Sequence, residues 1–134
     1  AWTTEAGISA FLEVPTKLDF RPGGQLELHF APTAPEGMRG TEGCQILAWI
    51  PERMLAFSWN APPHLKEVRK ERTFVVLTFE PEGTTHTRVR LSHGGFEENI
   101  RAMPTLKDEW LAARAYFAKA WPNVLGKFES SHHK

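Results

Sequence analysis

Residues 105–128 read TLKDEWLAARAYFAKAWPNVLGKF, and their apolar positions recur at steps of three and four. This spacing predicts one long amphipathic helix whose apolar stripe packs on another layer of the protein. Thr105, with Asp108 three residues later, predicts a capping box at its start. Such a helix would span roughly 36 Å, enough to cross a whole sheet. The stripe comprises Leu106, Trp110, Ala113, Phe117, Trp121, Val124 and Phe128.

The residues before this helix alternate with the period of β-strands. Leu26, Leu28 and Phe30 alternate with polar residues, and the turn sequence Arg21-Pro22-Gly23-Gly24 in front of them predicts a hairpin with residues 14–20. Six strands followed by one helix predict a single α+β domain over residues 1–134, in which a curved antiparallel sheet wraps around the helix. The other four strands are predicted over residues 41–50, 54–59, 67–80 and 87–93, each followed by Pro, Gly or a Pro-rich loop.

Composition and motifs narrow the class of protein. Sixteen basic residues balance sixteen acidic ones without a basic cluster, which argues against a nucleic-acid or membrane-surface partner. The single cysteine, Cys44, excludes an internal disulfide, and a reducing compartment, the cytoplasm, is expected. No phosphate-binding, dinucleotide-binding or metalloprotease motif occurs, so we expect neither a cofactor nor a metal.

Aromatic residues are unusually frequent, with five Trp and nine Phe. They can fill a solid core, or they can line an apolar hollow left between a curved sheet and the helix and finished by a few polar groups. On the second interpretation the ligand cavity is lined by Leu28, Phe30, Phe57, Trp59, Leu77, Phe79, Leu91, His93, Trp110, Phe117 and Trp121.

Three polar residues are candidates for the end of this cavity. Within the strand predicted over 67–80, Arg69 and Glu71 share the parity of Val75 and Leu77, so they could line its rim; the alternative is a solvated strand end. His93 shares the inward parity of Leu91. Either both of its ring nitrogens are satisfied by loop backbone, or one is left for a ligand's polar head. In the second case ligand affinity should change near the ordinary histidine pKa of roughly 6.5.

Several motifs, taken together and in order, resemble one known family. The resemblance covers nearly the whole chain, and the family is the activator of heat-shock-protein-ninety ATPase homologue-like group of the START-like (SRPBCC) superfamily. The motifs are Ala1-Trp2-Thr3-Thr4, Asp19-Phe20-Arg21-Pro22-Gly23-Gly24, Gly40-Thr41, the segment from Pro51 to Trp59, the segment from Thr87 to His93, and the helix from Trp110 through Trp121-Pro122-Asn123-Val124-Leu125.

The resemblance implies a helix-grip fold of seven strands, two short helices after the first strand and a long C-terminal helix, with a cavity for apolar ligands. Against that plan the chain lacks the first strand, and it starts abruptly at Ala1-Trp2. We therefore expect an N-terminally incomplete domain, with at least one strand and one helical turn before Ala1. Ala48 stands where the family often has an acidic residue. The co-chaperone activity in the family name belongs to proteins with an additional domain and is not carried over.

Three functions are compatible with the sequence. The leading hypothesis is an intracellular carrier or sensor, a monomer or homodimer that binds a small apolar or amphipathic ligand. The second is a cyclase, dehydratase or hydrolase that uses His93, Glu71 or Arg69 in acid–base chemistry. The third is an interaction module with a solid core. An enclosed cavity with polar groups at one end separates the first two hypotheses from the third.

Overall fold

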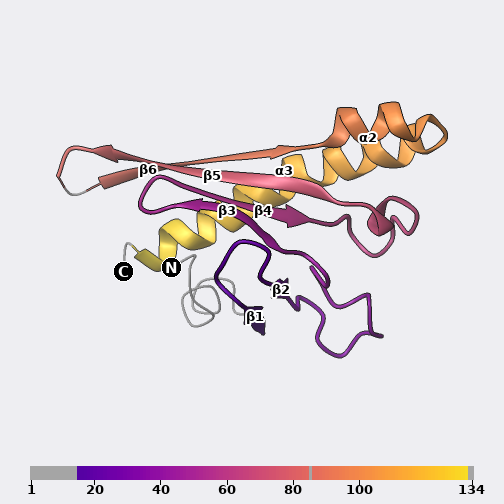
Figure 1. Cartoon of the computed structure of the whole chain (residues 1–134), viewed down its shortest axis with the longest axis horizontal. Helices are drawn as coiled ribbons and strands as arrows, with labels where there is room; N and C mark the ends of the chain where they lie inside the picture. The colour runs from indigo at the N-terminus through magenta and orange to yellow at the C-terminus, as the bar shows by residue number, and fades with distance from the viewer. Residues whose placement is uncertain (1–14, 85, 133–134) are drawn as a thin grey trace.

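The computed structural model describes residues 15–84 and 86–132. Six strands and two α-helices make up this part of the chain, together with two short 3-10 helices (Figure 1). In chain order they are β1 (Thr16–Leu18), β2 (Leu26–Leu28), β3 (Ile46–Ile50), β4 (Met54–Trp59), η1 (Val68–Lys70), β5 (Thr73–Glu82), β6 (His86–Gly94), α2 (Phe96–Ala102), η2 (Pro104–Leu106) and α3 (Lys107–His132). Neither α-helix in this part of the chain combines the length and apolar character needed to cross a bilayer.

The strands follow one another in sequence order and are antiparallel throughout. β1 pairs with β2, and β3, β4, β5 and β6 form a four-stranded sheet. Backbone hydrogen bonds connect the two sheets, from Leu26 N to the Cys44 carbonyl and from Ile46 N to the Gly24 carbonyl, both 2.9 Å. The predicted α+β architecture with sequential hairpins is therefore confirmed.

The parity expected for β5 and β6 is also observed. Val75 pairs with His93 and Leu77 pairs with Leu91, so these alternate residues lie on one face of the hairpin. Val75 and Leu77 are fully buried. This face and the corresponding face of β4 belong to a single apolar core, which also contains the stripe of α3.

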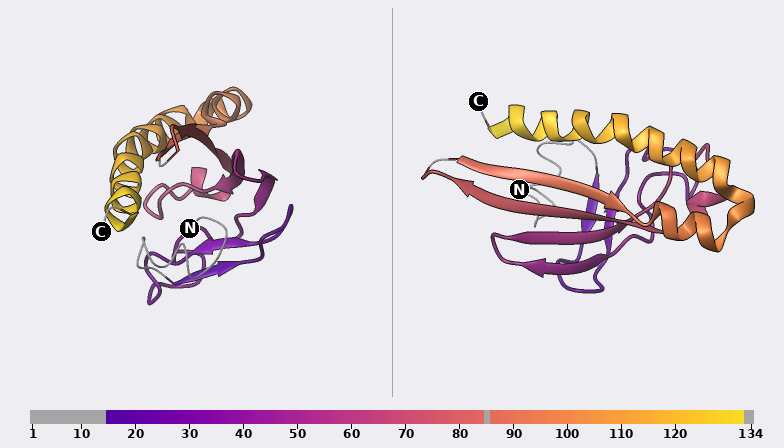
Figure 2. Two further views of the ribbon diagram at one scale, coloured as in Figure 1. Left: turned by 90° about the vertical axis from the view of Figure 1, so that its left-hand side faces the viewer. Right: turned by 90° about the horizontal axis from the view of Figure 1, so that it is seen from above.

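α3 lies along the sheet on its concave side, as the two views of Figure 2 show. Among the described residues of its stripe, Trp110, Ala113, Phe117 and Trp121 are buried, at the predicted spacing. The helix begins later than the capping box predicted: Thr105 lies inside the 3-10 turn η2, which starts at Pro104. Proline fixes its own backbone angle and suits the first position of such a turn. The sequence patterns also did not predict α2.

The strand predicted over residues 67–80 is wrong over its first six residues, 67–72. Residues 68–70 form the 3-10 helix η1, and β5 begins only at Thr73. The Glu109 carboxylate of α3 accepts the backbone N–H groups of Glu67 and Val68 at 3.0 and 3.3 Å. These N–H groups are therefore satisfied by a side chain and not by a neighbouring strand.

Candidate ligand pocket

A pocket of about 280 Å³ opens at the end of the sheet where β4 finishes. Four segments line it: the loop within residues 30–41, residues 59–63, Arg69 of η1, and the face of α3 from Tyr116 to Val124. The pocket is thus bounded by loop, strand end and helix. It does not lie in the middle of the sheet–helix interface, where the aromatic core is packed.

The walls of the pocket are largely aromatic. The rings of Trp59 and Trp121 lie 5.1 Å apart between centroids, and Phe117 stacks on Trp121 at 6.2 Å. All three side chains are buried in the core on one side and line the pocket on the other. Ala120 and Val124 complete the helical wall with smaller side chains. Such a surface favours a ligand with a flat or flexible apolar body.

Arg69 forms the polar end of the pocket together with the loop that follows Gly37. Its Nε and Nη2 donate to the Gly37 carbonyl at 3.1 and 3.0 Å, Nη2 also donates to the Gly40 carbonyl at 2.6 Å, and Nη1 donates to the Ala61 carbonyl. The side chain is only 8% exposed. Burial lowers the pKa of Arg69, and Glu42 opposes that shift, but a guanidinium remains protonated in any case.

The carboxylate of Glu42, opposite in charge to Arg69, also holds this loop in place. Its carboxylate accepts the backbone N–H groups of Gly37, Arg39 and Gly40, and it lies 4.0 Å from Arg69 Nη2. Partial burial opposes ionisation, yet these three hydrogen bonds leave the pKa of Glu42 below its ordinary value. Arg69 thus holds carbonyl groups of the loop, and Glu42 holds its N–H groups.

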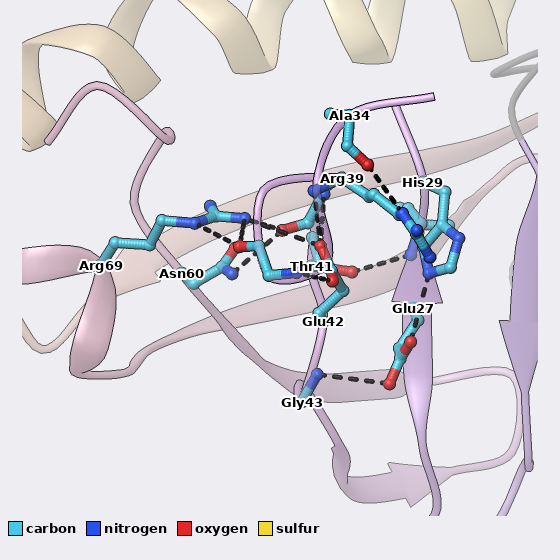
Figure 3. Close-up of polar contacts among 12 residues, drawn as sticks. Glu27, His29, Ala34, Arg39, Thr41, Glu42, Gly43, Asn60 and Arg69 are labelled. Carbon is cyan, nitrogen blue, oxygen red and sulfur yellow. Dashed lines mark hydrogen bonds and ion pairs between the residues drawn. The ribbon is translucent and has the colours of Figure 1, made fainter. Parts of the chain in front are cut away.

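The loop is also fixed to β2. Thr41 Oγ1 accepts the Leu28 N–H at 2.8 Å and donates to the Leu26 carbonyl. Gly40 passes so close to β2 that a β-carbon there would lie 1.7 Å from the Leu28 carbonyl oxygen. Only glycine fits at this position. Figure 3 shows Arg69 and Asn60 together on one side of the loop, with Arg39 running away from them toward His29.

Asn60 is the second polar side chain at this end. It is 5% exposed, and its Nδ2 donates to the Gly40 carbonyl at 3.0 Å, the same oxygen that Arg69 Nη2 contacts. No described residue donates a hydrogen bond to its Oδ1. The alternation of apolar and polar residues did not predict a role for Asn60, because this residue lies in the loop after β4.

The residues expected to line a cavity divide into two groups. Phe30, Trp59, Phe117 and Trp121 line the pocket, and Arg69 does so from η1 instead of a strand. Glu71 is exposed and outside the lining, because its segment is not the strand that its parity assumed. The remaining residues pack in or against the core outside the lining: Leu28, Phe57, Leu77, Phe79, Leu91, His93 and Trp110.

His93 lies within an aromatic cluster, and both of its ring nitrogens have protein partners. Nδ1 accepts the Trp121 indole N–H at 2.9 Å, and Nε2 lies 2.6 Å from Thr73 Oγ1. The expectation that one nitrogen is left for a ligand is therefore not met, and the partners are side chains instead of loop backbone. Burial lowers the pKa of His93 to about 4, so the expected titration near neutrality is also wrong.

The other reactive groups offer little chemistry at this pocket. His93 is paired with Thr73 and Trp121, and so it forms no acid–base pair with Arg69 or Glu71. Burial raises the pKa of the Cys44 thiol to about 11, which leaves it protonated and weakly nucleophilic. Within residues 15–84 and 86–132, no group of His, Cys, Asp and Glu side chains is arranged to hold a metal ion.

Comparison with known proteins places this fold in a family. The chain is similar to the crystal structure of protein MLL2253 from Mesorhizobium loti, with a TM-score of 0.53 and 22% identity over 98% of this chain and 82% of that one. No curated protein matches the chain. The family described as "Activator of Hsp90 ATPase homolog 1-like protein" matches residues 1–131. The chain therefore belongs to this family of START-like, helix-grip proteins.

Proposed function

We propose that this protein binds a small apolar or amphipathic molecule in the pocket between the 30–41 loop and α3, as a carrier or sensor. The observation that carries the proposal is the pocket of about 280 Å³ with an aromatic wall and a buried polar end. A pocket of this size suits a small organic molecule. Membership of a START-like family supports a ligand-binding role.

Two features favour binding over catalysis and over a solid interaction module. The Asn60 and Arg69 side chains are held in hydrogen bonds to backbone carbonyls, and His93, the expected acid or base, is outside the described lining. The pocket lies beside the packed core, so the same aromatic residues belong to the core and also line the pocket. This arrangement is suited to holding a molecule in a fixed orientation.

The side chain of Phe117 provides the test. Phe117→Leu keeps an apolar residue on α3 but removes a ring from the pocket wall, and we expect the dissociation constant for 1-octanol to rise about 3- to 10-fold. Isothermal titration calorimetry measures this, and circular dichroism checks that the variant is folded. Phe79→Leu makes the same change against the core, outside the lining, and should bind as the parent does.

Two results would count against the proposal. Titration of the parent with 1-octanol and similar probes could give no heat, which would mean that the pocket is not a ligand site. A folded Phe117→Leu protein with the parent's affinity for every probe would mean that this face of α3 does not line the site.

A further inference from the structure

The polar end of the pocket is built by two buried side chains that meet at one atom. Arg69 Nη2 and Asn60 Nδ2 both donate to the Gly40 carbonyl oxygen, at 2.6 and 3.0 Å. Both side chains line the pocket, and both are more than nine-tenths buried. They come from different segments, η1 and the loop after β4, and Figure 3 shows them side by side. Their shared acceptor fixes their positions relative to each other.

These two side chains have hydrogen-bonding capacity left over. A guanidinium has five N–H donors, and Arg69 uses four of them on the carbonyls of Gly37, Gly40 and Ala61, which leaves one on Nη1 among the described residues. Asn60 has one further N–H on Nδ2 and its Oδ1. Arg69 and Asn60 therefore each offer one N–H donor from neighbouring positions, and the donor of Arg69 is cationic.

The charge of the pocket wall is positive. Among the described residues that line it, the charged side chains are those of Arg39 and Arg69, and none is Asp or Glu. The carboxylate of Glu42, outside the described lining, lies 4.0 Å from Arg69 Nη2 and already accepts three backbone N–H groups. A cationic ligand would thus be repelled by Arg69, whereas an anion would be attracted by it.

We infer that the ligand of this pocket is an apolar chain or ring ending in a carboxylate, with the carboxylate at Asn60 and Arg69. This rests on the proposed function and adds the chemical class of the ligand. The two carboxylate oxygens accept the remaining N–H groups of Arg69 Nη1 and Asn60 Nδ2, while the apolar body lies on Trp59, Phe117 and Trp121. Charge-assisted hydrogen bonds of this kind are about twice as strong as neutral ones.

The test uses one alkyl chain with four head groups: octanoate, octanamide, 1-octanol and octylamine, titrated calorimetrically into the whole chain at pH 7. We expect octanoate to bind at least about 10-fold more tightly than octanamide, and octylamine to bind most weakly. Binding of 1-octanol with no preference for octanoate would overturn the carboxylate inference and leave the proposed function standing. Absence of binding by all four would overturn both.

Asn60→Asp tests the location of the head group. The new carboxylate neutralises Arg69, so octanoate should lose at least about 10-fold in affinity while octylamine gains. A purely structural role of Asn60 would weaken all four probes alike, and that result would contradict the inference. Asn99→Asp is the matched control, since Asn99 Nδ2 also donates to a carbonyl, that of Arg72, but lies outside the pocket. Should Asn60→Asp not fold, the ranking of the four probes on the parent still decides.

Discussion

Arg69→Met is expected to lower the free energy of unfolding by about 3–5 kcal/mol, measured by urea denaturation. Methionine keeps an apolar stem of similar length but has no donor for the carbonyls of Gly37, Gly40 and Ala61. A buried polar group left without a partner costs about 1–3 kcal/mol, and Arg69 donates to three carbonyl groups. Glu42 would also lose the cation that lies 4.0 Å from its carboxylate. The pocket loop and the end of β4 should therefore separate early in unfolding.

Two further variants test whether the loss of stability comes from the carbonyl contacts of Arg69. Arg101→Met makes the same substitution on α2, where the side chain is 74% exposed and pairs with Glu97 at 3.9 Å; it should change the free energy of unfolding by less than about 0.5 kcal/mol. Arg69→Lys retains the charge but cannot reach three carbonyl groups at once, so an intermediate loss is expected. An Arg69→Met protein within about 1 kcal/mol of the parent would show that the carbonyl contacts do not hold the loop.

Much of the fold could be predicted because its elements follow local patterns. The stripe of α3 repeats every three or four residues, and the alternate residues of β5 and β6 face one core, so each element is specified by its own sequence. The order of the strands then follows from short hairpin connections. These features do not depend on contacts between distant residues.

The pocket could be predicted only in part because its polar end depends on such distant contacts. Arg69 meets the carbonyls of Gly37 and Gly40 across about thirty residues of sequence. Glu109, about forty residues away, holds the N–H groups that would otherwise be free to extend β5. Parity therefore assigned Arg69 to a strand that does not form, and it gave no reason to choose Asn60. The aromatic wall was found because Trp59, Phe117 and Trp121 lie on regular elements.

The His93→Gln substitution is expected to remove most of the stability loss that protonation of His93 causes at low pH. In the parent, Nδ1 accepts the Trp121 N–H, and Phe96 and Phe117 pack against the ring with centroids 4.7 Å away. These neighbours and Thr73 are all uncharged, so burial alone lowers the pKa of His93 to about 4 from an ordinary value of 6.5. Protonation would also break the bond from Trp121. The neutral form is thus the folded form.

The sign of the pH effect follows from this shift. The pKa of His93 is lower in the folded state than in the unfolded state, so its contribution is complete above about pH 6.5 and is lost as the pH falls toward 4. The unfolding free energy of the parent should therefore fall by roughly 3 kcal/mol more than that of His93→Gln between pH 7 and pH 4. Glutamine can still accept from Trp121 and donate to Thr73, so the variant should remain folded. His64→Gln, at an exposed position beside Tyr116, should follow the parent curve. If unfolding free energy depended on pH in the same way for the parent and His93→Gln, the pKa of His93 would be equal in the folded and unfolded states. The prediction that His93 is buried in its neutral form would then be wrong.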